Sequence, residues 1–178
     1  HVVGFIESAC KMNPALFSRA TDTLSFLMAD KAVPVIMSSI RANINLYRPT
    51  FMRLARAPHT IKHAAELWNG VEAMRDRITE LLRAKQANVQ NIAMTYLECV
   101  VAVHSMPTAN SVTKGQDVGL NAVPLGHPFL DLDQLKRSGR EAFDTLAHEL
   151  LSPEASGAGV GVIIGLLADI SWQRPQYM

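Results

Sequence analysis

Three side chains that could bind a metal ion lie close together in the sequence: His59, His63 and Glu66. Histidines four residues apart share one face of a helix, so this pair could bind a single zinc ion. A zinc protease, however, needs a glutamate directly after the first histidine, and Thr60 stands there. We interpret the pair as surface or interhelical histidines, and we expect no metal site and no cofactor.

A glycine-rich stretch near the end of the sequence contains the beginning of a nucleotide-binding loop. Gly157 and Gly159 have the spacing of the first two glycines in the dinucleotide fingerprint, but Val162 stands at the third position. The pattern of the residues before Gly157 does not predict a strand, which the fingerprint also requires. The glycines therefore favour close packing of two helices over phosphate binding.

The sequence lacks an arrangement typical of nucleophilic catalysis. It contains no Gly-x-Ser-x-Gly, and neither Cys10 nor Cys99 has a histidine beside it. The two cysteines lie far apart inside helical patterns, which predicts buried thiols of an intracellular protein. Asp131 and Asp133 are typical of a helix start, where the helix dipole favours carboxylates. We expect a protein that is not an enzyme.

Positive charge is concentrated in one segment. Between Asp30 and Glu66 there is no acidic residue, and six basic residues give this segment a charge of +6. The remaining residues must then carry −5, because the net charge of the chain is +1. The segment could form a patch that attracts phosphates or acidic partners, or it could be a solvated outer face. The basic residues are Lys31, Arg41, Arg48, Arg53, Arg56 and Lys62.

The elements that must position these groups are predicted to be helices. Hydrophobic residues make up 48% of the 178 residues, but aromatic residues only 6%, a mixture that favours close helix packing. Apolar residues recur three or four positions apart through most of the chain, which is the period of an amphipathic helix. The expected helices cover residues 2–11, 16–28, 33–47, 61–82, 89–104, 132–151 and 157–172, with Asp30 and Asn88 as expected N-caps.

Residues 106–131 are the main exception to the helical pattern. They contain three prolines and three glycines without a sustained period, so we expect a long loop, and loops of this length are usually functional. We also expect no membrane span. The longest apolar run, Gly157 to Ala168, is shorter than the roughly 20 residues that a bilayer requires.

Prolines mark the ends of four expected helices. Pro14, Pro49, Pro107 and Pro175 each follow an apolar helical stretch, and proline lacks the N–H that continues a helix. Residues 50–57 would then form a short separate turn. Two of these ends are near-copies, residues 48–52 and 174–178, and similar stops after similar helices indicate stacked helical hairpins. The sequence predicts an all-α fold, an irregular stack of antiparallel hairpins in one domain over residues 1–178, which we expect to be part of a longer protein.

Four segments, in this order, resemble the N-terminal domain of the symplekin family. The first resembles the family pattern Gly-Phe-Ile-Glu-Glu-x-Cys-Lys, and the last resembles its small-Leu-x-x-Ile-Ala-x-x-Arg-Pro-x-Phe-Met. The second is similar to a leucine-rich turn and its helix, and the third to a helix in which Ala93 and Glu98 match. The segments are residues 2–11, 27–47, 89–101 and 164–178.

The resemblance implies a HEAT-repeat scaffold (an α-solenoid) that is nuclear and belongs to the pre-mRNA 3′-end cleavage and polyadenylation machinery. It also implies that the domain binds and stimulates a phosphatase of the RNA polymerase II C-terminal tail, together with cleavage and polyadenylation factors as partners. In the family a lysine of the helix matching residues 89–104 contributes to the phosphatase-binding face, and Thr95 occupies that position here. We expect partner contacts at Asn88, Gln90, Asn91 and Thr95, polar positions on or before an apolar helix.

A second function remains open from the charge pattern. The basic segment 31–62 could bind RNA or a phosphopeptide directly, and such binding would weaken steeply as salt is added. Binding of single-stranded RNA would favour aromatic side chains for base stacking, and in this segment they are limited to Tyr47 and Phe51.

Overall fold

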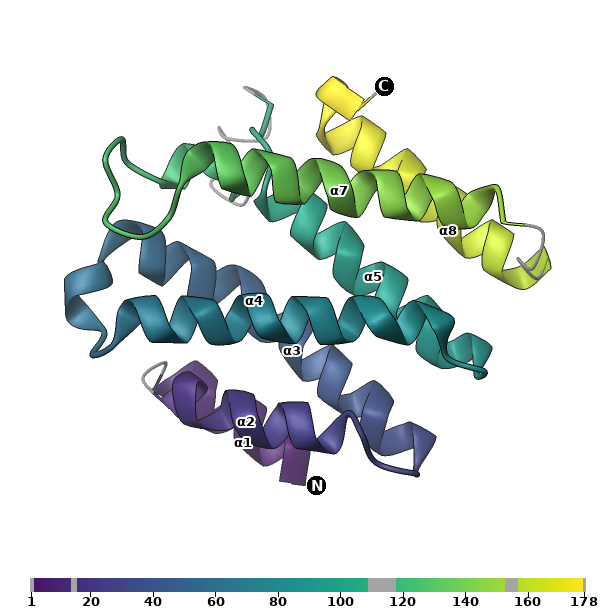
Figure 1. Ribbon diagram of the computed structural model, residues 1–178, viewed down its shortest axis with the longest axis horizontal. Helices are drawn as coiled ribbons and strands as arrows, with labels where there is room; N and C mark the ends of the chain where they lie inside the picture. The colour runs from purple at the N-terminus through teal and green to yellow at the C-terminus, as the bar shows by residue number, and fades with distance from the viewer. Residues whose placement is uncertain (1, 14–15, 109–117, 153–156, 178) are drawn as a thin grey trace. The chain divides into compact units, whose positions relative to one another are not determined.

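The computed structural model describes residues 2–13, 16–108, 118–152 and 157–177. These residues form helices and turns and contain no strand, which confirms the prediction of an all-α fold (Figure 1). The α-helices are α1 (Val2–Met12), α2 (Phe17–Leu27), α3 (Val33–Arg56), α4 (Ala64–Glu80), α5 (Ala87–Val103), α7 (Leu132–Leu150) and α8 (Gly157–Gln173). Short 3₁₀ turns are η2 (Pro58–Thr60), η3 (Leu81–Arg83), η4 (Leu120–Ala122) and η5 (Pro175–Tyr177).

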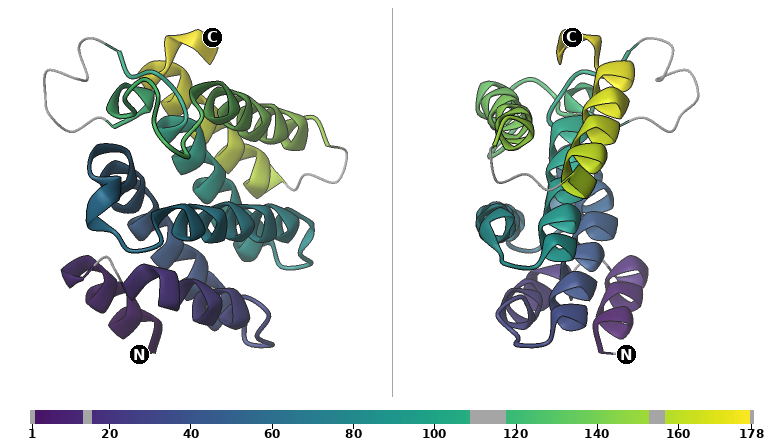
Figure 2. Two further views of the ribbon diagram at one scale, coloured as in Figure 1. Left: turned by 60° about the vertical axis from the view of Figure 1, so that its left-hand side comes forward. Right: turned by 90° about the vertical axis from the view of Figure 1, so that its right-hand side faces the viewer.

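The chain divides into two compact units, His1–Tyr96 and Leu97–Met178, and the division falls within α5. The first unit contains two helical hairpins, α1–α2 and α3–α4. Within it, α1 packs beside α3 and α2 packs beside α4, so the helices form two layers (Figure 2). Their apolar faces meet in a core that includes Leu24, Ile40, Phe51, Leu54 and Ile78, all fully buried.

The second unit contains the end of α5, the hairpin α7–α8 and the turn η5. Helix α7 packs against α8, and η5 packs against the end of α8. Apolar side chains three or four residues apart place one face of α7 in the core, from Leu135 through Ala142 to Leu146. Hairpins thus occur in both units, as the sequence predicts, and the prediction of a single domain stays a prediction.

The expectation that Pro49 ends a helix is wrong. Helix α3 continues through Pro49 to Arg56, so residues 50–57 are not a separate turn. Pro49 and Asn45 are exposed, so water can solvate the Asn45 carbonyl, whose helical partner would have been the missing N–H. The residues that follow supply a second reason, because continuing the helix buries Phe51 and Leu54 completely. The other described stops are confirmed: α5 ends before Pro107, and α8 ends before Pro175, while Pro14 lies outside the described residues.

Two expected N-caps are also corrected. The N-cap of α3 is Ala32, and Asp30 instead accepts a hydrogen bond from the Ala32 N–H at 2.7 Å, which closes the preceding turn. Helix α5 begins one residue before Asn88, whose side-chain oxygen accepts from the Val89 N–H at 3.0 Å. Asp131, by contrast, is the N-cap of α7 and accepts from the Gln134 N–H at 2.7 Å.

The described parts of the expected loop, residues 106–108 and 118–131, contain no α-helix and no strand. The turn η4 and the buried side chains of Leu120 and Leu130 fasten the later part to the second unit. The Leu120 N–H donates to the Ser105 carbonyl at 3.0 Å, just beyond the end of α5. Residues 109–117 lie outside the described residues.

Candidate interaction surfaces

Three of the four expected partner-binding residues lie on one face of α5. Asn88, Asn91 and Thr95 are spaced i, i+3 and i+7, a spacing that aligns side chains along a helix. Asn88 is exposed, and the other two are half-buried. Most of the remaining circumference is apolar and buried, including Val89 and Ala93, which are fully buried. We call Asn88, Asn91 and Thr95 the α5 stripe.

Gln90 does not belong to the α5 stripe. It lies two residues after Asn88, which turns its side chain by roughly 200° around the helix. The buried Met94 lies between Gln90 and the stripe on the helix surface, because it is four residues from Gln90 and three residues from Asn91. Gln90 is half-buried at this separate position. The sequence pattern predicted polar positions on α5 but did not separate its two sides.

The α5 stripe is polar but uncharged. The Thr95 hydroxyl donates to the Asn91 carbonyl of the same helix at 3.1 Å, which leaves the hydroxyl oxygen as an acceptor. The Asn88 side-chain oxygen is bonded to Val89 N–H, so its amide group remains a donor. A partner on this stripe would meet hydrogen-bond donors and acceptors without net charge, and its affinity should depend little on salt.

The helix that carries the stripe is held firmly in the first unit. Tyr96, 1% exposed, follows Thr95 and packs edge-on against Tyr47 of α3, with ring centroids 5.5 Å apart. Edge-to-face aromatic pairs of this kind add about 0.5–1.5 kcal/mol beyond their buried area. The stripe is therefore a preorganised surface, since the residues beneath it are packed in the core.

The six expected basic-patch residues are not gathered at one place. Lys31 precedes α3, and Arg41 lies about 18 Å along that helix from Arg53, since a helix rises 1.5 Å per residue. Arg48 is half-buried, whereas Lys31 and Arg41 are exposed. Three of the six follow one another closely in the chain, at the end of α3 and just after it: Arg53, Arg56 and Lys62.

The two histidines of the expected pair do not share a helix. His59 lies in the turn η2, and His63 is the N-cap of α4. The His63 backbone has a positive φ of 57°, and its Nδ1 lies 3.1 Å from Oε1 of Glu66. Among the residues that the structure describes, no group of three His, Cys, Asp or Glu side chains is placed to hold a metal ion.

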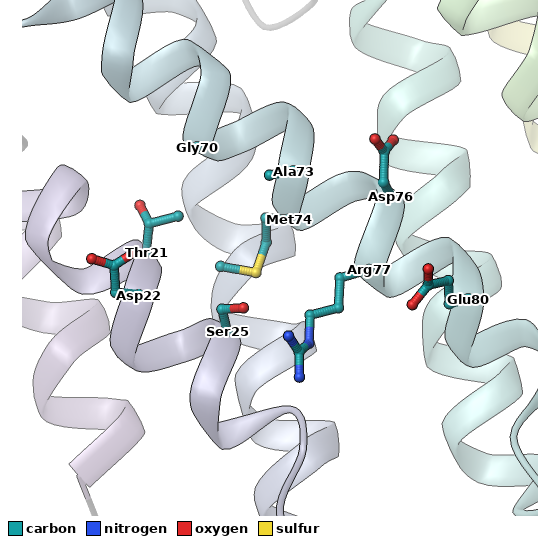
Figure 3. Close-up of a pocket in the computed structure, with 9 residues that line it drawn as sticks. All are labelled: Thr21, Asp22, Ser25, Gly70, Ala73, Met74, Asp76, Arg77 and Glu80. Atoms are coloured by element: carbon teal, nitrogen blue, oxygen red, sulfur yellow. The ribbon is translucent and has the colours of Figure 1, made fainter.

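A groove between α2 and α4 was not indicated by any sequence pattern. It has a volume of about 440 Å³, with Thr21, Asp22 and Ser25 on one side and α4 on the other (Figure 3). The helices approach closely at Gly70, where an added Cβ would lie 3.3 Å from the Thr21 methyl. Asp76 at its margin is already paired with Arg75 at 2.9 Å. The groove is open and of mixed charge, and the sequence lacks a signal for it because two helices form it jointly.

Glu98 of α5, in the second unit, has a carboxyl group whose pKa is shifted by its surroundings. Burial raises its pKa, and the like charge of Asp169 on α8 raises it further. The folded chain therefore holds the Glu98 proton to a higher pH than the unfolded chain. Between the two pKa values the folded state binds more protons, so the free energy of unfolding falls as the pH rises through this window.

Replacing Glu98 with glutamine should therefore raise the melting temperature at neutral pH. The gain should shrink as the pH falls from the raised pKa towards the ordinary pKa of a glutamate, and it should vanish below the ordinary pKa, where residue 98 is uncharged in both proteins. Thermal melts followed by circular dichroism between pH 4 and pH 8 would measure this. Glu141→Gln, at an exposed site of α7, is the control. A lower melting temperature of Glu98→Gln at neutral pH would contradict the account.

No helix in the described part of the chain combines the length and the apolar character that crossing a bilayer requires.

A comparison with protein families gives a match that covers most of the chain. The family model described as Symplekin/PTA1 N-terminal matches residues 32–178. The matched residues include the α5 stripe and most of the described helices, from α3 to α8.

Proposed function

Because the chain belongs to the Symplekin/PTA1 N-terminal family, a scaffold family of 3′-end processing, we propose that it binds and stimulates a phosphatase of the RNA polymerase II C-terminal tail. Family membership and the hairpin architecture make the chain a HEAT-like scaffold domain that works with 3′-end processing factors. We further propose that the chain acts in cleavage and polyadenylation in the nucleus, and that it is not itself an enzyme.

The observation that carries the proposal is the α5 stripe. A folded partner needs a preorganised surface, and the stripe is the polar, partly exposed side of a helix whose other sides are packed. The stripe lies on α5, the helix that the family resemblance assigns to phosphatase binding. The family has a lysine at the position of Thr95, so the contact here would use neutral hydrogen bonds in place of a charge.

The partner surface would extend beyond these three residues. A stable protein complex buries about 1,600 Å² in total, or roughly 800 Å² on each partner, and three side chains supply only part of that. The stripe would be the central polar contact, and neighbouring exposed positions of the first unit would form the rim. Direct RNA binding through the whole segment 31–62 is not favoured, because its basic residues are dispersed along α3.

The test is a substitution that alters the stripe without altering the fold. Thr95→Arg places a long charged side chain at one end of the stripe, and we expect it to weaken phosphatase binding by about tenfold or more, since it adds bulk and an unpaired charge. Calorimetric titration with the phosphatase measures the affinity. A phosphatase assay on a phosphoserine peptide measures the stimulation, which should fall in parallel.

Gln90→Arg is the matched control, because it adds the same side chain to the same helix away from the stripe. We expect it to change the affinity by less than about threefold. Equal weakening by both variants would show that the charge of α5, and not the stripe, governs binding. Full binding by Thr95→Arg would exclude the stripe as the contact surface.

A further inference from the structure

The connection between α3 and α4 forms a compact corner, which we define as residues 53–63. Arg53 and Arg56 lie in the last turn of α3, and the chain then passes through η2 before α4 begins. Ile61 is 7% exposed and anchors the corner in the core of the first unit. The Thr60 hydroxyl donates to the Ala57 carbonyl at 2.8 Å, which closes the turn. The buried Ile61 side chain and the Thr60 hydrogen bond therefore fix the conformation of the corner.

The outer side of the corner carries an excess of cationic side chains. Arg56 and Lys62 are exposed, and Arg53 is half-buried. None of the three makes an ion pair with a residue in the part of the chain that the structure describes. Residues 53–63 contain no carboxylate.

Two histidines add hydrogen-bonding groups at the same corner. His59 and His63 are both exposed, and the ring of His63 is held by Glu66 of the first turn of α4. The positive φ of His63 directs the chain sharply into α4, whose N-cap residue makes no side-chain capping hydrogen bond. The positive end of the helix dipole therefore adds to the potential of Arg56 and Lys62.

The chemistry of the corner favours phosphoryl groups over nucleic-acid bases. Residues 53–63 contain no Phe, Tyr or Trp. The nearest large rings, Phe51 and Trp68, are buried and pack against each other with centroids 5.9 Å apart. Single-stranded RNA binding relies on exposed rings that stack on bases. A long phosphate backbone would also need a track of cations, and Arg41 lies far from the corner along α3.

From this arrangement we propose that the α3–α4 corner binds a phosphorylated peptide. The guanidinium groups of Arg53 and Arg56 can donate paired hydrogen bonds to the oxygens of a phosphoryl group. Lys62, which follows the turn η2, adds a third cation. The ligand would be an extended, phosphoserine-bearing segment, because the corner is an exposed turn that an extended chain can follow. The inference does not depend on phosphatase binding, and its test contains no phosphatase.

Fluorescence anisotropy with the full 178-residue chain tests the proposal. The probes are a labelled peptide with two phosphoserines, the same peptide with two serines, and an oligouridine of similar charge. We expect binding of the phosphopeptide alone, weakening as salt increases. Inorganic phosphate, added as a competitor, should displace the peptide only at concentrations far above that of the unlabelled phosphopeptide.

Two double variants with the same change in net charge locate the site. Arg56→Glu with Lys62→Glu reverses two exposed charges of the corner, and we expect about tenfold weaker binding of the phosphopeptide or a complete loss. Lys31→Glu with Arg41→Glu reverses two exposed charges outside it and should change the affinity by less than about twofold. Circular dichroism melts of both variants establish that each remains folded.

Four results would overturn the proposal. Equal weakening by the two double variants would mean non-specific attraction to net charge. Equal binding of the peptide without phosphate would remove the role of phosphoryl groups. Binding of the oligouridine in preference to the phosphopeptide would assign the corner to RNA. Displacement by inorganic phosphate and unlabelled phosphopeptide at equal concentrations would mean a site for phosphate alone.

Discussion

Replacing Arg174 with alanine is expected to lower the free energy of unfolding of the second unit by about 3 kcal/mol or more. Its side chain is fully buried, and its guanidinium donates to the Ala102 carbonyl from Nη2 at 2.8 Å and to the Ser105 hydroxyl from Nε at 2.7 Å. Removing the guanidinium would leave these oxygens buried without those donors, at about 1–3 kcal/mol for each group. The vacated volume adds a cavity cost.

Urea denaturation measures this loss, and Arg137→Ala is the matched control. Arg137 is an exposed arginine on α7, where substitutions usually change stability by no more than about 0.5 kcal/mol. Arg174→Lys should recover only part of the loss, because an ammonium group cannot reproduce the planar fork of the guanidinium. Equal stability of Arg174→Ala and the unmodified chain would contradict a structural role for these hydrogen bonds.

Replacing Gly139 with alanine is expected to destabilise the second unit by about 1–3 kcal/mol, although alanine is the better helix former. A Cβ at this position of α7 would lie 2.7 Å from the His104 carbonyl oxygen and 2.9 Å from the His104 Cβ. A backbone carbonyl cannot rotate away as a side chain can, so α7 would have to move away from the end of α5. The free-energy cost of such overpacking exceeds the gain in helix propensity from glycine to alanine.

Gly165→Ala makes the opposite prediction in the same unit. Gly165 also lies within a helix, α8, but an added Cβ would meet no atom within 4 Å. The substitution should therefore stabilise the chain by up to about 1 kcal/mol, through helix propensity alone. Denaturation of the two alanine variants side by side compares the effects. A stabilising Gly139→Ala would show that α7 is not packed closely against the end of α5.

The two near-identical pentapeptides show how much of this fold is readable from local sequence. Residues 48–52 and 174–178 both begin with Arg-Pro, and the same helix stop is predicted for both. Pro175 does end α8, but Pro49 lies inside α3. Local propensity is the same in the two cases, and the difference comes from the burial of Phe51 and Leu54 beyond Pro49. Tertiary packing therefore overrides the proline signal where the following residues complete a core.

The helices themselves were predictable because their apolar residues recur with the helical period. The residues that fasten one helix to another were not. Arg174 was interpreted as part of a helix end and Gly139 was not singled out, since their roles depend on Ala102 and His104, which are distant in the sequence. A contact of this kind leaves no local pattern.

The candidate surfaces were predictable in part for the same reason. Polar positions on α5 stand out against its apolar residues, but the helix turns Gln90 away from Asn88 and Thr95. The excess of positive charge after Asp30 is visible in the sequence, whereas its concentration at the α3–α4 corner depends on where α3 ends. Because α3 continues past Pro49, Arg53 and Arg56 lie in the last turn of that helix, next to Lys62.

The most direct test of the proposed scaffold function is a calorimetric titration of the unmodified chain with the C-terminal-tail phosphatase, at low and at moderate salt. The uncharged α5 stripe predicts saturable binding with one phosphatase per chain and affinities at the two salt concentrations that agree within about threefold. Absence of binding at both concentrations would contradict the account, and binding that disappears at moderate salt would show that exposed charges, and not the stripe, hold the partner.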